Sequence, residues 1–440
     1  MSAPSAPAHG SDWPGARRDG DGVDRRDRLP PAAEWQYFLK LYAASAKNPL
    51  VEANHESRAP RLEPAHLRHV LGARLQRGHR IRILRNGDEI FPPMLDAIRA
   101  ARRSIEFLFF IYWGGEIGEQ FCDALIERAK AGVRVLVIFD GFGSKPMPRE
   151  LRERFRASPV QTRTFHPLPH WKFWNSAART HRKILTVDGI RAYTGGVGIA
   201  QEWTGDADGP RHYRDTQFEI QGPAVADFRA EFFQTWAATG GRTPDQLDCP
   251  DQLHIPAGVP AAVIASTGAQ RWAEIALMFQ CLVRAAQASL LIVTPYFVPG
   301  PVLLDELLAT AERGVAIRIM TSGAQNDHKL ALRAGQRLYV ELLEAGVELF
   351  EYDRTLLHSK AVVVDRRFCC IGSPNMNQRS QSLDDEIAMI AADPELASEL
   401  LADFEADLEH CRTIRARQWR HRGFGQRLGE RLASMLEAQL

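Results

Sequence analysis

Two short segments of the chain carry the same set of chemically active side chains: a histidine, a lysine two positions later and an aspartate five positions after the lysine. The two sets are His181, Lys183, Asp188 and His358, Lys360, Asp365. Both lie in strand-like runs, KILTVD and KAVVVD, where residues two apart project from the same face. An imidazole can attack phosphorus or protonate a leaving oxygen, and an ammonium offsets charge on the remaining oxygens. Each histidine–lysine pair therefore suits chemistry at a phosphodiester.

A single set of this kind is typical of an ordinary polar strand, but an internal repeat places the two sets at matching positions. In the first copy, helices are expected near 94–104, 117–131 and 148–157, and strands near 105–113, 133–140 and 160–165. In the second copy, helices are expected near 277–287, 302–313 and 329–344, and strands near 290–297, 315–322 and in VELFEYD. Because both sets recur in one repeated unit, we favour a catalytic role for them.

This alternation of strands and helices, with continuously apolar strands, predicts an α/β fold. We expect two tandem domains, each a mixed sheet covered by helices on both faces, packed around one shared active site. The predicted boundaries are a disordered or irregular leader with a short helix at 1–60, a first domain at 61–245, a second domain at 246–415 and a basic amphipathic helix at 416–440.

The residues that follow each set extend the pattern to a known family. The first set is followed by Gly195-Gly196-Val197-Gly198, and the second by Gly372-Ser373-Pro374-Asn375 and then by MNQRS and DDE. With the TPYFVP segment at 294–299, these motifs resemble the phospholipase D superfamily and, within it, bacterial cardiolipin synthases. The resemblance spans roughly residues 70–415. It implies a phosphatidyltransferase that acts on phospholipid phosphodiesters through a covalent phosphohistidine intermediate.

The resemblance also implies roles for individual residues. His181 is expected to attack phosphorus and His358 to protonate the leaving alcohol, while Lys183 and Lys360 hold the phosphate oxygens with help from Ser373 and Asn375. Asp188 and Asp365 are expected to be structural. Gly198 departs from the family, which has an asparagine there, so the first half lacks an amide side chain at this place.

Each histidine also needs a partner that fixes its tautomer and orientation. Asp215 follows His181, and Glu386 follows His358, each at the start of a strand-like segment. We expect these two carboxylates to orient the histidines, with Asp384 and Asp385 as the alternatives to Glu386. Two lysines and a protonated histidine supply the positive charge of the site, so no metal ion and no other cofactor are expected.

Charge and flanking segments bear on the substrate. The formal net charge is +1, which gives no global attraction to nucleic acid. Aromatic and basic residues alternate at 166–179, and seven arginines precede an apolar helix face near the C-terminus, at 412, 415, 417, 420, 422, 427 and 431. Such segments are typical of proteins that bind membrane surfaces, although both could instead pack on their own domains.

We therefore expect a phosphatidyl donor such as phosphatidylglycerol, an alcohol acceptor, a membrane surface and no nucleic acid as partners. A hydrolase of the phospholipase D type and a nuclease with the same paired motif remain the alternatives. An internally duplicated site favours a monomer. The absence of an apolar run long enough to span a bilayer favours a cytoplasmic protein at the inner face of the cell membrane.

Overall fold

In the computed structural model, the described residues are 70–167, 178–244, 254–268 and 274–434, and they belong to one compact unit. The expected leader at 1–60, most of the aromatic segment at 166–179 and the last six residues lie outside them. So does most of the expected domain boundary, because 245–253 is not described.

The first half of the unit contains seven strands. They are β1 (Gln76–Arg85), β2 (Ser104–Phe109), β3 (Arg134–Asp140), β4 (Gln161–Phe165), β5 (Lys183–Val187), β6 (Arg191–Gly195) and β7 (Thr216–Gln221). Its α-helices are α4 (Asn86–Ala100), α5 (Glu116–Lys130), α6 (Arg149–Arg156) and α7 (Ala224–Ala238), and a short 3-10 helix, η2, spans Gln201–Trp203.

The second half repeats this order. Its strands are β8 (Val259–Ser266), β9 (Ser289–Val293), β10 (Ala316–Ser322), β11 (Glu348–Tyr352), β12 (Ala361–Val364), β13 (Phe368–Gly372), β14 (Glu386–Ala392) and β15 (Cys411–Ile414). Its helices are α8 (Glu274–Ala285), α9 (Pro301–Glu312), α10 (Lys329–Gln336), α11 (Tyr339–Glu344), α12 (Gln378–Ser382), α13 (Pro394–Leu408), α14 (Ala416–Arg420) and α15 (Phe424–Ser434).

One mixed sheet runs through both halves. Its strand order is β15-β11-β10-β9-β12-β13-β14-β8-β1-β7-β6-β5-β2-β3-β4. Apart from β15, equivalent strands of the two halves follow one another in the same order from each edge of the sheet to its centre. There β1 and β8 pair antiparallel. Parallel pairing is confined to β2–β3–β4 and β9–β10–β11. The predicted α/β class with a mixed sheet and two similar halves is confirmed.

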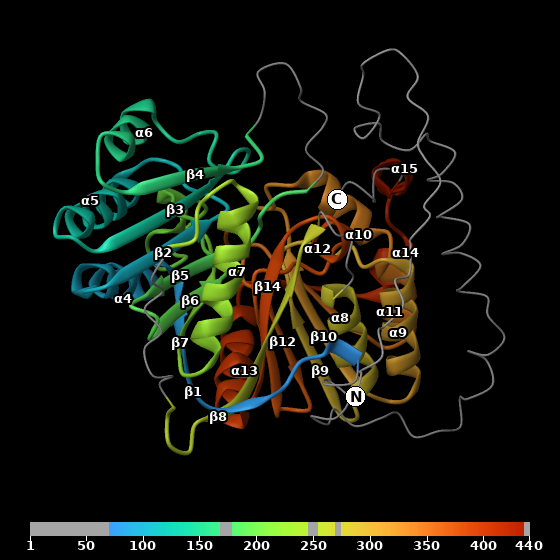
Figure 1. The fold of residues 1–440 in the computed structure, drawn as a ribbon. Helices are drawn as coiled ribbons and strands as arrows, with labels where there is room; N and C mark the ends of the chain where they lie inside the picture. Colours follow the sequence, from blue (N-terminus) through green and yellow to red (C-terminus); the bar gives the residue numbers. More distant parts are fainter. Residues whose placement is uncertain (1–69, 168–177, 245–253, 269–273, 435–440) are drawn as a thin grey trace, which may run out of the picture. The chain divides into compact units, whose positions relative to one another are not determined.

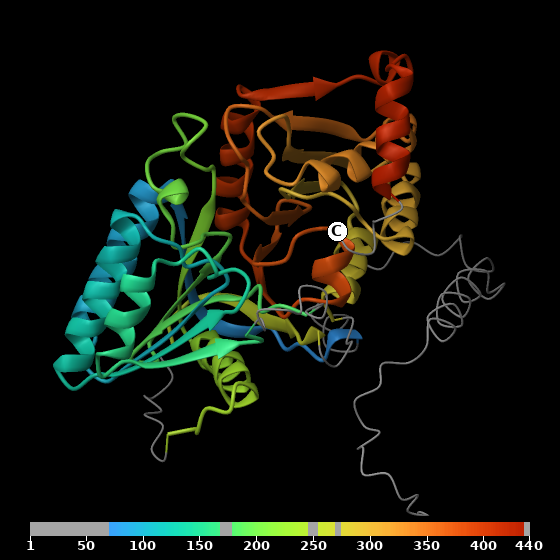
Figure 2. The ribbon, with the colours of Figure 1, turned by 90° about the horizontal axis from the view of Figure 1, so that it is seen from above.

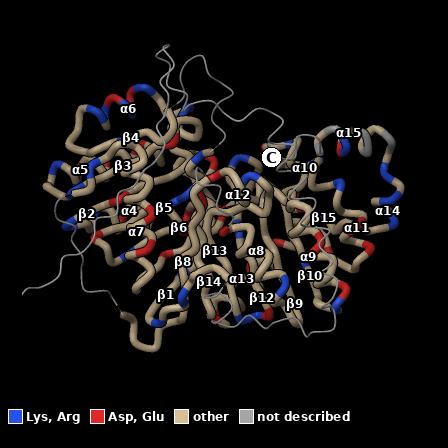
Figure 3. Tube along the Cα trace, turned by 45° about the vertical axis from the view of Figure 1, so that its right-hand side comes forward, with Lys and Arg blue, Asp and Glu red and all other residues tan. Residues whose placement is uncertain are grey.

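Helices cover both faces of the sheet, as Figures 1 and 2 show. In the first half, α4, α5 and α6 pack on one face of the sheet, and Phe91, Phe121 and Phe155 of these helices are part of the core there. In the second half, α8, α9 and α11 pack over an equivalent core. A third core, beneath α7 and α13, contains apolar side chains of both halves. This shared core holds the two repeats together. Charges of both signs are spread over both halves (Figure 3).

Most of the predicted elements lie where the apolar pattern places them, but two of the predicted helices are divided. The helix expected at 329–344 is divided into α10 and α11. The expected terminal helix at 416–440 is also divided, into α14 and α15, by a three-residue turn at 421–423. Helix α15 packs on α10, where the buried Ala433 meets Ala331 and Ala334. Part of this segment therefore packs on the second half, while Arg431 is exposed.

Candidate active site

The two histidine–lysine pairs lie at one edge of the sheet. Lys183 begins β5 and pairs with Phe109 at the end of β2. In the same way Lys360 directly precedes β12, whose first residue pairs with Val293 at the end of β9. Both pairs are thus placed at the carboxyl ends of parallel strands, the edge at which α/β proteins commonly bind ligands.

Backbone hydrogen bonds connect each histidine segment to the opposite half. The amide of His181 donates to the carbonyl of Asp385 at 2.9 Å, and the amide of Asp385 donates to the carbonyl of Arg179 at 2.7 Å. Symmetrically, the amide of His358 donates to the carbonyl of Arg214 at 2.7 Å. These two short parallel bridges bring the histidines of the two repeats into one site.

The proposed orienting carboxylates bind the histidines in a crossed arrangement. Nδ1 of His181 lies 2.9 Å from Oε1 of Glu386, and Nδ1 of His358 lies 2.8 Å from Oδ2 of Asp215. Each carboxylate therefore serves the histidine of the other repeat. Within a repeat, β6 separates β7 from β5, and β13 separates β14 from β12. Since neighbouring strands are about 4.8 Å apart, a histidine and the carboxylate of its own repeat are too far apart to bond.

Asp384 and Asp385, which the sequence offered as alternatives to Glu386 for orienting a histidine, make other contacts. Asp384 accepts hydrogen bonds from the guanidinium of Arg379 at 2.8 and 2.9 Å. Asp385 accepts one from the amide of Gly268 at 2.9 Å. Burial raises the pKa of Asp384 to about 7, despite the opposing effect of Arg379.

Both lysines fold back over their own histidine segments. Nζ of Lys183 donates to the carbonyl of His181 at 2.8 Å, and Nζ of Lys360 donates to that of His358 at 2.6 Å. Nζ of Lys360 also lies 2.9 Å from Nδ1 of His358. The edge of Phe110 covers His181, with ring centroids 5.3 Å apart. Two ammonium groups and two imidazoles thus lie together, with hardly any exposure.

Ser373 and Asn375 occupy different environments. The hydroxyl of Ser373 donates to Oε2 of Glu386, so in this state it binds the carboxylate rather than a phosphate position. The side chain of Asn375 is buried, and its carbonyl oxygen has no hydrogen-bond partner among the described residues. Gly198 faces a filled space: a Cβ there would lie 3.0 Å from Ile111 and 3.1 Å from Trp203.

The two aspartates of the repeated sets lie away from the histidines and bind backbone. Asp188 accepts hydrogen bonds from the amides of Arg102, Arg103 and Ser104 at 2.7 to 3.1 Å. Asp365 does the same for Gln287, Ala288 and Ser289. Each carboxylate thereby fixes the turn between a helix and the parallel strand that leads to the site, which agrees with the structural role expected of both.

Burial governs the electrostatics of the site. Desolvation lowers the pKa of His181 to about 4, against the attraction of Glu386, and it also lowers the pKa of His358. Desolvation and the ammonium of Lys360 lower the pKa of Lys183 to about 7, and desolvation lowers that of Lys360 to about 8. Burial alone would raise the pKa values of Asp215 and Glu386, but the facing histidine and lysine groups hold both below their usual range.

The lowered pKa values of Lys183 and Lys360 mean that the nearby carboxylates do not fully offset the cost of burying the two ammonium groups. Without a ligand, both carboxylates are ionised, both imidazoles are neutral, and the lysines titrate near neutral pH. An anion placed between the lysines would favour their charged forms and raise their pKa values. A phosphodiester carries such a charge.

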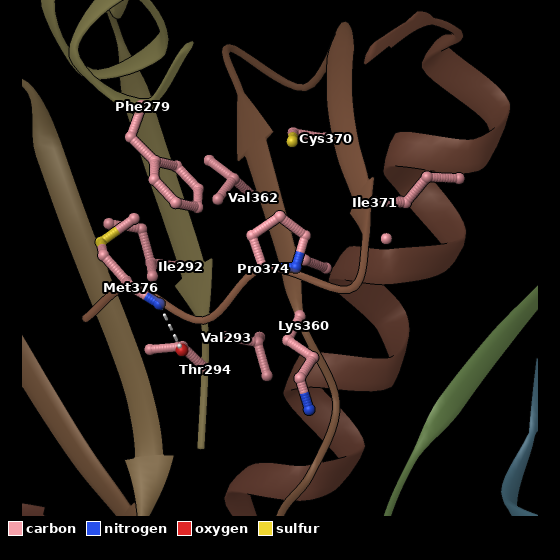
Figure 4. Close-up of a pocket in the computed structure, with 12 residues that line it drawn as sticks. Phe279, Ile292, Val293, Thr294, Lys360, Val362, Cys370, Ile371, Pro374 and Met376 are labelled. Atoms are coloured by element: carbon pink, nitrogen blue, oxygen red, sulfur yellow. Dashed lines mark hydrogen bonds between the residues drawn. The ribbon is translucent and has the colours of Figure 1, made fainter. Parts of the chain in front are cut away.

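A small cavity lies beside Lys360, lined largely by apolar side chains of β9, β12 and β13. In Figure 4 the lysine amine points away from Phe279 and Cys370. The aliphatic part of the side chain is therefore packed among apolar groups, which contributes to the desolvation of its charge.

Two aromatic residues of the site were not expected from the sequence. Trp203 donates from Nε1 to Oδ2 of Asp215 at 2.7 Å and meets His358 edge to face at 5.2 Å. Phe110 lies over His181. Phe110 sits in a run predicted as strand, where apolar residues need no special explanation. For Trp203, one signal was available, because it stands as far beyond His181 as Ser380 stands beyond His358.

Comparisons with known proteins agree with this geometry. The family described as "Cardiolipin synthase, PLD-like domain" matches residues 94–236 and 280–408. A cardiolipin synthase of Geobacillus kaustophilus (strain HTA426) is 32% identical over 363 residues, which cover 81% of this chain and 72% of that protein. Cardiolipin synthase A of Pseudomonas aeruginosa (strain LESB58) is 33% identical over 360 residues, covering 81% and 73%.

The fold is also similar to a solved structure, that of phosphatidylserine synthase from Haemophilus influenzae Rd KW20. The TM-score is 0.60 at 16% identity, and the match covers 82% of this chain and 95% of that one. At this identity the likeness concerns the fold alone. From the family match and the two relatives together, the chain belongs to the phospholipase D-like family of the cardiolipin synthases.

Proposed function

We propose that the chain transfers a phosphatidyl group from phosphatidylglycerol to an alcohol, either glycerol or the glycerol end of a second phosphatidylglycerol, through a phosphohistidine intermediate. The observation that carries the proposal is the crossed pairing of two imidazoles with two carboxylates beside two lysines. Because Nδ1 of each histidine is held by a carboxylate, Nε2 of each is the nitrogen that can take part in the reaction. Nζ of Lys360 lies 3.1 Å from Nε2 of His358, close to where a phosphate oxygen would bind.

In the first step, Nε2 of His181 attacks phosphorus and the bond to the glycerol oxygen of the headgroup breaks. Once the phosphodiester anion is bound, its negative charge favours protonation of His358 at Nε2, against the lowering of its pKa by burial. His358 then gives this proton to the glycerol oxygen, and glycerol leaves. In the second step, His358 takes the proton of the acceptor hydroxyl, the acceptor oxygen attacks phosphorus, and the bond between phosphorus and His181 breaks. His181 is then neutral and His358 protonated, as at the start.

The lowered pKa of His181 leaves its imidazole neutral at physiological pH, as a nucleophile must be. The pKa of His358 is lowered as well, so the division of roles between the two histidines follows the family resemblance. Lys183 and Lys360 stabilise the charge that grows on the phosphate oxygens. The near-complete burial of both histidines limits competition by water and so favours transfer over hydrolysis. No cofactor enters this scheme.

The family and the substrate support a site of action at a membrane surface. Phe142 directly follows β3 and is 57% exposed, and Leu330, in α10 beyond β10, is 47% exposed. Both follow strand ends at the edge where the histidines lie. We propose that these side chains contact the lipid surface at the inner face of the cell membrane. No helix among the described residues is long and apolar enough to cross a bilayer.

We further propose that the chain acts as a monomer, because its own two halves supply both histidines and both orienting carboxylates.

Thin-layer chromatography of the products from phosphatidylglycerol vesicles tests the function. We expect cardiolipin and glycerol with the unaltered chain. His181→Asn or His358→Asn should reduce turnover by roughly 10³-fold or more. The exposed His421→Asn is the matched control and should retain full activity. Phosphatidic acid as the sole lipid product would make the chain a hydrolase. Cleavage of DNA without lipid turnover would contradict the proposal.

A further inference from the structure

The two halves of the site differ at one pair of positions. Gly198 and Asn375 stand equally far beyond their own histidines, and so do Trp203 and Ser380. The short helices η2 and α12, which contain Trp203 and Ser380, begin at equivalent residues, Gln201 and Gln378. In one half a glycine is thus combined with a tryptophan, and in the other an asparagine with a serine.

The sizes at these positions are exchanged in space as well as in sequence. In the first half, a Cβ on Gly198 would lie 3.1 Å from the indole ring of Trp203. In the second half, the backbone N–H of Asn375 donates to the hydroxyl of Ser380 at 3.2 Å. Trp203 therefore lies next to Gly198, the position equivalent to Asn375 of the other half. Together with Ile111, at 3.0 Å from the same Cβ, it limits the size of the residue at 198.

The donors to the two orienting carboxylates are exchanged too. Ser373 donates to Glu386, the partner of His181. Its counterpart in the first half is Gly196, where a Cβ would lie only 2.1 Å from Asp215, so no hydroxyl can stand there. Nε1 of Trp203 donates to Oδ2 of Asp215 instead, the same oxygen that binds His358.

We propose that Trp203 is the positioning residue of the His358 half-site. Its indole N–H holds Asp215 in place of a serine hydroxyl, and its ring braces His358 from the side. As a consequence, the first half has no side-chain amide at Gly198, and the position equivalent to it in the second half carries one on Asn375. This inference rests on the proposed phosphohistidine chemistry and assigns unequal support to its two histidines.

The charged groups that face His358 are Asp215, Lys360 and, further away, Lys183. Asp215 in turn faces His358, Lys360 and the Trp203 N–H, and it accepts the amide of Thr216 at 2.8 Å. Removing the indole donor concentrates the negative charge of Asp215. A more basic Asp215 stabilises the protonated form of His358, so the pKa of His358 must rise. His181 and Glu386 share none of these contacts with Trp203.

Trp203→Phe and Ser373→Ala form a matched pair of variants, since each removes one donor and leaves the other histidine untouched. Nitrogen NMR of ¹⁵N-histidine-labelled full-length protein follows both imidazoles, whose signals are assigned by their loss in His181→Asn and His358→Asn. We expect Trp203→Phe to raise the pKa of His358 by about one pH unit and to leave that of His181 unchanged. Ser373→Ala should do the reverse.

The same pair is then compared in turnover of phosphatidylglycerol. Trp203→Phe should lower kcat about ten-fold or more, with the basic limb of the pH profile moved to higher pH. The NMR titration needs no turnover. It therefore decides the role of Trp203 even if no phosphatidyl transfer is found, which would defeat the proposed function alone. Equal shifts of both histidines, or no shift of His358, in folded Trp203→Phe would overturn the inference.

Thermal unfolding tests whether Trp203 limits the size of the residue at position 198. Gly198→Asn alone should lower the melting temperature, because its side chain meets Trp203 and Ile111. Adding Trp203→Ser should recover part of that loss, since the double variant copies the residue pair of the second half. A double variant less stable than the sum of the two single effects would contradict the exchange.

Discussion

Burial disfavours the charged forms of both active-site lysines. Burial lowers the pKa of both lysines, and Asp215 and Glu386 oppose this effect, together with Asp384 at Lys183 and Asp327 at Lys360. A residue whose charged form is disfavoured in this way is poised to bind an anion, because the ligand restores the missing charge. Catalysis requires the same property, since the negative charge on the phosphate oxygens changes most in the transition state.

Binding of an unreactive phosphate analogue should therefore take up protons. The pKa values of Lys183 and Lys360, about 7 and about 8 in the free site, rise when the anion binds. Between pH 7 and 8 the free lysines are partly deprotonated, so the sign is uptake. Calorimetry with vanadate in buffers of different ionisation enthalpy measures the number of protons.

Lys183→Met and Lys360→Met should each reduce that uptake, while the exposed Lys130→Met serves as the control and should not alter it. Proton release on binding, or uptake that is unchanged in both variants, would contradict the view that the lysines are the titrating groups.

Among the secondary-structure elements, Asp188 and Asp365 connect the ends of β5 and β12 to the turns before β2 and β9 by hydrogen bonds. Asp188 and Asp365 have left-handed backbones, with φ of 53° and 51°, at the ends of β5 and β12. This conformation is tolerated by aspartate better than by most residues. It directs the carboxylates to the turns before β2 and β9, the strands on which the histidine strands are hydrogen-bonded.

Asp188→Ala and Asp365→Ala should each lower the free energy of unfolding by roughly 2–4 kcal/mol, because backbone N–H groups lose charged acceptors. Urea denaturation followed by circular dichroism measures the loss. Asp96→Ala, on an exposed helix face, is the control and should cost less than about 0.5 kcal/mol. A similarly small effect at Asp188 and Asp365 would show that they are not structural.

Glycines at the ends of β6 and β13 have a structural reason that involves no contact with substrate. Gly195 and Gly372 have positive φ, and a Cβ on either would lie about 2.5 Å from a backbone oxygen of the neighbouring strand. The first glycine of each motif is thus required by close strand packing, and the residue after it meets the orienting carboxylate.

For the whole molecule, the continuous sheet and the core shared by α7 and α13 hold the two halves at a fixed separation. Phe142 and Leu330 extend from the same edge of the two halves, which would let one membrane surface present lipid to both histidines.

Phe142→Ser combined with Leu330→Ser should reduce co-sedimentation with phosphatidylglycerol vesicles about ten-fold or more, because two apolar side chains no longer enter the lipid. Ile190→Ser is the matched control. Ile190 is 40% exposed but follows β5 at the opposite edge of the sheet, so its replacement should leave binding unchanged. Equal losses in both proteins would place the lipid contact elsewhere.

The sequence by itself determined the chemistry and most of the elements. A spacing of two predicted that His181 lies with Lys183 and His358 with Lys360, although both histidines come just before their strands, β5 and β12. Apolar runs predicted β2, β3, β9 and β10 because these strands are buried on both faces. Strands β1 and β8 were not predicted. They join the halves at the centre of the sheet, and β1 alternates charged and apolar residues without a strongly apolar run.

Only the tertiary structure decided which carboxylate serves which histidine. In sequence, Asp215 belongs to His181 and Glu386 to His358, but strand order puts β6 and β13 between them and leaves the partner across the domain interface within hydrogen-bonding distance. The same holds for Trp203, whose indole reaches Asp215 only once β7 and η2 have packed together. Local patterns encode what a segment becomes, while contacts between segments depend on the order in which the sheet arranges them.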